Sequence, residues 1–128
     1  MPLIMFGIAN CDTVKRGKDW LTQRGIEFAF HDYKKAGIDR ALLETWVEEH
    51  GWEVVLNRAG TTFKKLPDSD KANLDARKAV ELMIAQPSMI KRPILDVGDR
   101  RIVGFKSEIY EAALRPNSTA SLPTGIPN

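Results

Sequence analysis

Two apolar segments flank a helical pattern at the beginning of the chain. Residues 3–7 form a short, continuously apolar run, which is typical of a buried strand. Apolar positions then recur at helical spacing through residues 13–24, and residues 27–33 alternate weakly and predict a second strand. Because a strand, helix, strand unit is a right-handed crossover, we expect the two strands to be parallel. The loop before the helix then lies at the carboxyl end of the first strand, where ligand sites of open α/β sheets are found.

The middle of the chain carries helical patterns on both sides of an irregular stretch. A helix is predicted between Asp39 and Gly51, because Asp is a typical N-cap residue and Gly commonly ends helices. Its apolar stripe around Trp46 is expected in the core. Residues 52–69 predict a loop-rich segment with a short helical turn, and helical spacing returns over 74–84 and stops before a proline.

The last third of the chain predicts a hairpin and a closing helix. Apolar runs at 94–97 and 101–104 flank a glycine-containing turn, so these strands are expected to be antiparallel. Ser107 is the predicted cap of the last helix. Residues 116–128 have little apolar content and are expected to be disordered. The predicted core positions of the last helix are Ile109, Ala112, Ala113 and Leu114.

This order of elements predicts an α/β fold with the layout of a thioredoxin-like domain. The expected sheet is mixed, has four strands and is flanked by helices. We expect one domain over residues 1–115, with a helical insertion at about 38–91, between the second and third strands.

The composition is that of an ordinary globular chain, with 43% hydrophobic and 28% charged residues among 128. The net charge of +2 is small and its cations are interleaved with acids, which does not favour direct nucleic-acid binding. His31 and His50 lack metal-ligand spacing, so no metal site is expected. No apolar run has the length of a membrane span or the flanks of a signal peptide, and we therefore expect a cytoplasmic protein without a membrane partner.

Cys11 is the only cysteine in the chain and stands just before the first predicted helix. A thiol at that position meets unpaired backbone N–H groups and the positive end of the helix dipole, which lower its pKa. Lys15 and Arg16 add positive charge in the first turn. A lone free cysteine is most often a small buried apolar residue, but this setting favours a reactive thiolate.

Four sequence blocks in order resemble the ArsC/Spx family, closest to its YffB-like branch, over about residues 3–114. The blocks are FGIANCDTVK at 6–15, NRAGTTFKKL at 57–66, IKRPIL at 90–95 and VGF at 103–105. The resemblance implies that Cys11 is the catalytic cysteine and that Arg58 and Arg92 line an anion site. It further implies that Pro93 is the cis proline of thioredoxin-like folds and that Lys15 stands where arsenate reductases carry an arginine.

The chain departs from the arsenate reductases of this family at two positions. They have a histidine four residues before the cysteine and a third arginine after the last strand, where this chain has Gly7 and Phe105. Lys106 is adjacent and is a partial substitute for that arginine. These departures weaken the prediction of arsenate reduction and leave thiol exchange intact.

The expected function is that of a glutathione-dependent monothiol reductase with Cys11 as nucleophile. No tightly bound cofactor is expected; glutathione is the predicted co-substrate, because its carboxylates match the cations at positions 15, 58 and 92. Its partner would be a small-molecule or protein disulfide. Two alternatives stay open: a glutaredoxin-type arsenate reductase, and a regulator that binds RNA polymerase as Spx does, although Spx-type proteins usually carry a second cysteine where Val14 stands here. Further candidate site residues are Asn10, Thr13, Arg16 and Lys106.

Overall fold

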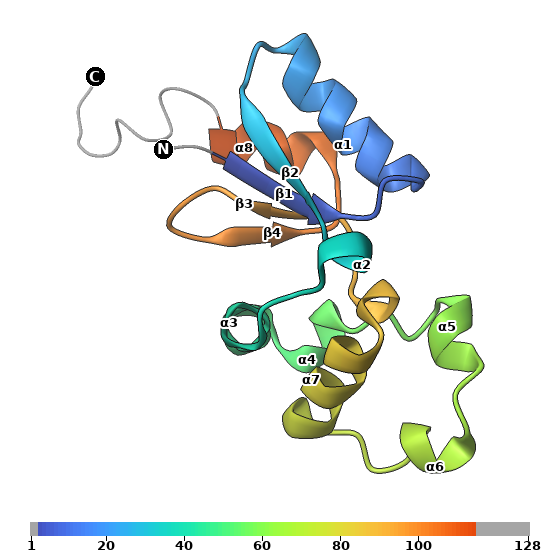
Figure 1. The fold of residues 1–128 in the computed structure, drawn as a ribbon. Helices are drawn as coiled ribbons and strands as arrows, with labels where there is room; N and C mark the ends of the chain where they lie inside the picture. The colour runs from blue at the N-terminus through green and yellow to red at the C-terminus, as the bar shows by residue number, and fades with distance from the viewer. Residues whose placement is uncertain (1–2, 115–128) are drawn as a thin grey trace.

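A computed structural model describes residues 3–114 and shows a four-stranded sheet with helices packed around it (Figure 1). The strands follow the order β2-β1-β3-β4; β1 is parallel to β2 and antiparallel to β3, and β3 and β4 form an antiparallel hairpin. The expected tail at 116–128 lies outside the described residues. The four strands and the two helices outside the insertion are β1 (Leu3–Gly7), α1 (Asp12–Gln23), β2 (Phe28–Asp32), β3 (Ile94–Asp96), β4 (Arg101–Val103) and α8 (Ser107–Leu114).

The predicted thioredoxin-like fold is confirmed by this topology. The crossover from β1 through α1 to β2 gives the parallel pair, in which Leu3 lies opposite Phe28 and Gly7 opposite Asp32. The hairpin predicted around the glycine-containing turn is also present.

Between β2 and β3 the chain forms a block of helices that extends away from the carboxyl ends of β1 and β2 (Figure 1). Asp39 caps α3 as predicted, because its carboxylate accepts a hydrogen bond from the Leu42 N–H at 3.1 Å, and Gly51 follows the last residue of the helix. Trp46 of α3 is fully buried, as its apolar stripe indicates. The block consists of α2 (Tyr33–Ala36), α3 (Arg40–His50), α4 (Trp52–Val55), α5 (Thr61–Lys64), α6 (Asp68–Lys71), α7 (Ala76–Ala85) and the 3-10 helix η1 (Pro87–Met89).

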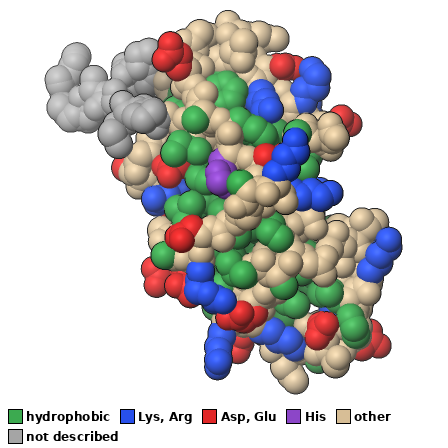
Figure 2. Space-filling model, viewed as in Figure 1, with side chains coloured by type: hydrophobic (Ala, Val, Ile, Leu, Met, Phe, Trp, Pro, Cys, Tyr) green, Lys and Arg blue, Asp and Glu red, His purple; other side chains and the backbone are tan. Residues whose placement is uncertain are grey.

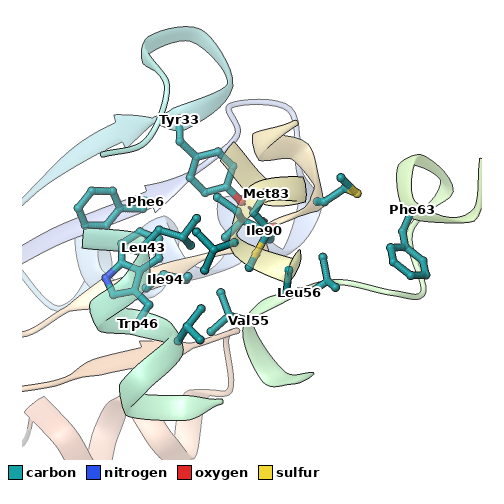
Figure 3. Packing of buried hydrophobic residues seen from close by; sticks show 14 residues of the cluster. Phe6, Tyr33, Leu43, Trp46, Val55, Leu56, Phe63, Met83, Ile90 and Ile94 are labelled. Carbon is teal, nitrogen blue, oxygen red and sulfur yellow. Dashed lines mark hydrogen bonds between the residues drawn. The ribbon is translucent and has the colours of Figure 1, made fainter. Parts of the chain in front are cut away.

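The central strand β1 divides the core into two clusters, because successive side chains of a strand point to opposite faces. Leu3 and Met5 point to one face and Phe6 to the other. The α1–α8 cluster consists of Leu3, Met5, Val14, Trp20, Leu21, Leu95, Ile102 and Tyr110. The insertion cluster joins Phe6, Tyr33 and Ile94 to buried residues of the helical block, among them Leu43, Trp46, Val55, Leu56, Met83 and Ile90 (Figure 3).

The structure differs from the sequence prediction at the end of β2. Tyr33 was expected to close the strand, but it begins the one-turn helix α2. The Asp32 carboxylate accepts hydrogen bonds from the N–H groups of Lys34 and Lys35, at 3.0 and 3.2 Å, and this cap turns the chain into the helix. The segment predicted to be loop-rich with one short helical turn, residues 52–69, contains the one-turn helices α4 and α5 and the beginning of a third, α6.

For the last helix, Ala113 and Leu114 pack against the α1–α8 cluster as predicted, whereas the predicted cap and the core positions Ile109 and Ala112 were wrong. Ser107 is the first helical residue of α8, and the carbonyl before it, that of Lys106, accepts the N–H of Tyr110 at 3.0 Å. Tyr110 is the fully buried residue of this helix, whereas Ile109 is 47% exposed and Ala112 is exposed. Within residues 3–114, none of the helices has the length and apolar character needed to cross a membrane.

Candidate functional site

Cys11 is the N-cap residue of α1 and is separated from β1 by the short loop of residues 8–10. Its backbone is extended (φ −139°, ψ 125°), and its carbonyl accepts the first helical hydrogen bond, from the Lys15 N–H at 2.9 Å. The thiol is partly exposed. Its sulfur therefore lies at the end of α1 where backbone N–H groups have no helical partner.

The surroundings of Cys11 stabilise the thiolate. Burial by itself raises the pKa of the Cys11 thiol, but the backbone N–H of Val14, the guanidinium of Arg92 and the N–H of Thr13 together hold that pKa below its ordinary value. The thiol thus meets the two conditions that activate a cysteine nucleophile, a helix N-terminus and a nearby cation.

Arg92 reaches this site from the opposite end of the sequence. It lies between η1 and β3, and its peptide bond to Pro93 is cis. One guanidinium nitrogen donates to the carbonyl of Ser88 at 2.9 Å, while Nε is buried without a hydrogen-bond partner among the described residues. The Arg92 side chain is half-buried, so its charge is less screened than that of an exposed arginine.

Tyr33 is a site residue that the sequence analysis missed. Its side chain is fully buried, and its hydroxyl donates a hydrogen bond to the carbonyl of Ile90 at 2.8 Å (Figure 3). Burial raises the pKa of this hydroxyl, and the positive charge of the nearby Arg92 guanidinium opposes the rise. The only local signal at Tyr33 was the end of an alternating strand, and its partner lies 57 residues further along the chain.

Asp32 is a second residue that was missed. One carboxylate oxygen caps α2 and the other accepts the N–H of Ala9 at 3.4 Å. It thereby ties the loop that carries Cys11 to the end of β2. An Asp near the end of a predicted strand, a residue type that favours the N-cap position, was the local signal for this cap.

The first-turn cations Lys15 and Arg16 lie at the surface. The Lys15 ammonium pairs with Asp19 at 2.9 Å, and its side chain is 73% exposed. Arg16 and Asn10 are also exposed. Figure 2 shows Lys and Arg side chains gathered on the surface where α1 begins and α2 lies. Lys34 and Lys35 of α2 are exposed. The cation that acts directly on the thiol is Arg92.

For Arg58 and Lys106, two other predicted site residues, the structure shows surroundings other than Cys11. The Arg58 guanidinium lies over the ring of Trp52, 5.3 Å from its centroid, and the residue is exposed. Lys106 is exposed at the beginning of α8. The structure therefore brings together Cys11, Thr13, Arg92 and Pro93, whereas Arg58 and Lys106 remain candidates by resemblance alone.

Gly7 shows that the site has no room for a side chain four residues before Cys11. A Cβ atom at Gly7 would lie 2.9 Å from Cγ2 of Val14 and 3.5 Å from Cε1 of Phe30. Val14 is fully buried. The neighbourhood that would have to hold a histidine at this position is filled by Val14.

Sequence comparison relates this chain to a family over nearly all of its described length. The model of the ArsC family matches residues 6–113. An uncharacterized protein of Haemophilus influenzae is 36% identical over 111 residues, which cover 87% of this chain and 97% of the relative. The global transcriptional regulator Spx of Streptococcus pyogenes serotype M3 is 25% identical over 112 residues, 86% of this chain and 83% of the relative.

Solved structures give the same relationship. A YffB protein is 56% identical and superimposes with a TM-score of 0.86 over 88% of this chain and 98% of its own. An arsenate reductase (ArsC) related protein from Brucella melitensis is 50% identical, with a TM-score of 0.71 over 90% of this chain and 96% of its own. The resemblance predicted from the four sequence blocks is confirmed by these matches.

Proposed function

This chain belongs to the ArsC family, and on that premise we propose that it is a thiol reductase whose nucleophile is Cys11 and whose resolving thiol is glutathione. The observation that carries the proposal is the lowered pKa of the Cys11 thiol. Two helix N–H groups and Arg92 lower this pKa by more than burial raises it. A thiolate is the attacking species in disulfide exchange, so a lowered pKa raises its fraction at neutral pH.

The proposed reaction has two exchange steps. In the first, the Cys11 thiolate attacks the glutathione sulfur of a mixed disulfide, the substrate S–S bond breaks, and the substrate leaves as a thiolate that takes a proton from water. In the second, a glutathione thiolate attacks the Cys11–glutathione disulfide, forms oxidised glutathione and releases the Cys11 thiolate. In sum, one glutathione thiol and the mixed disulfide become the substrate thiol and oxidised glutathione, one disulfide bond is exchanged for another, and the protein ends unchanged.

An external resolving thiol follows from the cysteine count. Cys11 is the only cysteine among the 128 residues, so no second protein thiol is available to close an intramolecular disulfide. Glutathione suits the charge of this surface, because its carboxylates would meet the exposed cations Lys15, Arg16 and Lys34 around the start of α1 and α2.

The experiment is turnover of a glutathione mixed disulfide by the wild type and by Cys11→Ser, with oxidised glutathione measured as product. We expect turnover by the wild type and none above background by Cys11→Ser. A parallel reaction with cysteine in place of glutathione tests the resolving thiol, and we expect it to be slower. Equal rates for both proteins would refute the enzyme, and equal rates with both thiols would refute the glutathione preference.

Regulation of transcription is the second candidate function, because relatives of similar length include the regulator Spx. In that case Cys11 would need no turnover, and the chain would bind RNA polymerase. Co-purification of polymerase subunits with the wild type and equally with Cys11→Ser, together with no turnover, would favour this function.

Arsenate reduction is the less favoured of the enzyme alternatives. The space at Gly7 is taken by Val14, and Phe105 packs against Tyr110, with ring centroids 4.8 Å apart, instead of offering a cation. The same assay with arsenate in place of the mixed disulfide is expected to give no turnover.

A further inference from the structure

We propose that Tyr33 is a positioning residue that holds Arg92 against Cys11 by fixing the segment from Ser88 to Arg92 through its hydroxyl. This inference rests on the proposed function, since it concerns the activation of the same thiol. It assigns a role to a fully buried polar group that disulfide exchange itself does not use.

The hydroxyl of Tyr33 joins two distant parts of the chain. It donates to the Ile90 carbonyl at 2.8 Å, so the first residue after β2 is tied to the segment that leads into β3 (Figure 3). Both the ring and Ile90 are fully buried in the insertion cluster. A buried hydrogen bond of this kind has a single geometry, because no water is present to replace either partner.

The segment fixed in this way carries Arg92. One guanidinium nitrogen donates to the carbonyl of Ser88 at 2.9 Å. The guanidinium also lies close enough to Cys11 and Tyr33 to lower the pKa of the thiol and to oppose the rise in the pKa of the tyrosine. The planar fork of an arginine can serve three acceptors at once. The Ser88 carbonyl thus orients the fork directly, and Tyr33 orients it through the Ile90 carbonyl of the same segment, so that the positive charge lies near Cys11.

The charged groups that act on the Tyr33 hydroxyl are Arg92, Cys11 and Asp32. Burial raises the pKa of Tyr33 above its usual range, Arg92 opposes this, and Cys11 and Asp32 add to it. The hydroxyl therefore remains protonated at neutral pH and donates to the Ile90 carbonyl.

Tyr110 provides a matched contrast within the same molecule. It is also fully buried, but it lies in the α1–α8 cluster, and its hydroxyl has no hydrogen-bond partner in the described part of the chain. Replacement of each tyrosine by phenylalanine removes one buried oxygen and keeps the ring volume. Only the Tyr33 hydroxyl is connected to Arg92.

The experiment is the pH profile of Cys11 alkylation by iodoacetamide in the full chain. The proteins are the wild type, Tyr33→Phe, Tyr110→Phe, Arg92→Met and the double variant Tyr33→Phe/Arg92→Met, and thermal unfolding establishes that each is folded. For Tyr33→Phe we expect a midpoint shifted to higher pH and alkylation on the order of threefold slower at neutral pH, the effect of one weakened hydrogen bond. Tyr110→Phe is expected to match the wild type.

The double variant shows whether Tyr33 acts through Arg92. We expect Tyr33→Phe to change the profile of Arg92→Met by less than about 1.5-fold, because the group that it positions is gone. A Tyr33→Phe profile equal to the wild type, or an equal shift in both backgrounds, would overturn the inference. A wild-type midpoint at the ordinary value of a free cysteine would instead remove the activated thiol on which the proposed function depends.

Discussion

Gly7 and Val14 fill the space at the end of β1 so closely that each restricts the other. Any side chain at position 7 would begin 2.9 Å from a methyl group of Val14, which is closer than carbon atoms approach without displacement. Val14 is β-branched and sits in a helix, where one χ1 rotamer is strongly preferred, so its methyl cannot swing aside. The glycine is therefore required by its neighbour, and a histidine does not fit without rearrangement of α1.

This contact predicts the cost of the smallest possible change. We expect Gly7→Ala to lower the free energy of unfolding by about 1–3 kcal/mol, the usual cost of overpacking a core. In the double variant Gly7→Ala/Val14→Ala the two costs should not add, because the second substitution removes the clashing methyl groups. Urea denaturation of the four proteins measures the coupling, and strictly additive costs would contradict the clash.

Gly17 is the control for this prediction. It is buried in α1, and a Cβ there would meet the terminal methyl of Met5 at 3.0 Å. Because the end of a methionine side chain moves easily and alanine favours helix over glycine by about 1 kcal/mol, Gly17→Ala should cost less than Gly7→Ala. A larger loss at Gly17 would show that flexibility of the neighbour does not decide the outcome.

The end of a helix could be predicted where the capping side chain bonds to a residue a few positions away. It was missed where a contact with a distant part of the fold decides at which residue the helix begins. Asp39 caps α3 through an N–H three residues away, a signal contained in the sequence around it. At α8 the local signal was Ser107, but Phe105 packs edge-on against Tyr110, and the helix begins one residue earlier than a Ser107 cap would allow. A shift of one residue rotates a helix face by about 100°, which is why Tyr110 is buried and Ile109 is exposed.

The two helix ends give a direct comparison of a capping and a non-capping side chain. We expect Asp39→Ala to lower the free energy of unfolding by about 1 kcal/mol, because the Leu42 N–H loses its acceptor. Ser107→Ala is expected to change it by less than about 0.5 kcal/mol, since that hydroxyl contacts only an exposed glutamate. Chemical denaturation measures both, and equal losses would restore Ser107 as the cap of α8.

The residues of the candidate site were likewise predictable where their contacts are local in sequence, and not where their partners are distant. The position of Cys11 at a helix start was predicted from residues 3–24 alone, and the structure confirms that start. Lys15 was expected to add positive charge near the thiol, and in the structure its ammonium pairs with Asp19, four residues away on the same helix face. Tyr33 gave no signal at all, because its partner Ile90 is brought close only by the completed fold.

At the scale of the whole molecule, the site lies where the two halves of the core meet. Cys11 packs against the α1–α8 cluster, whereas Tyr33 belongs to the insertion cluster on the other face of the sheet, and Arg92 follows that cluster's Ile90. The thiol and the guanidinium that lowers its pKa are thus supplied by different halves, 81 residues apart in sequence (92 − 11). The lowered pKa of Cys11 is a property of the folded chain only.

This dependence on folding makes the stability of the reduced protein sensitive to pH in a defined direction. The pKa of Cys11 is lower in the folded state than in the unfolded chain. In the folded state the N–H groups and Arg92 lower the pKa by more than burial raises it, and the unfolded chain has none of these effects. Between the two pKa values the unfolded chain holds the extra proton, so stability rises with pH. The thiolate contribution is fully present above the unfolded pKa of about 8.5 and disappears as the pH falls through the folded pKa.

We therefore expect the melting temperature of the wild type, relative to Cys11→Ser, to increase as the pH is raised from acid to about 9 under reducing conditions. Serine is itself a good N-cap residue and adds a constant offset to the melting temperature of Cys11→Ser. The test is therefore how the difference in melting temperature changes with pH, and not its sign at one pH. The same pair of proteins in an Arg92→Met background is the control, and its slope should be smaller because the guanidinium no longer favours the thiolate. If the difference in melting temperature does not change with pH, folding does not lower the pKa of the Cys11 thiol. The proposed reaction would then lack an activated nucleophile.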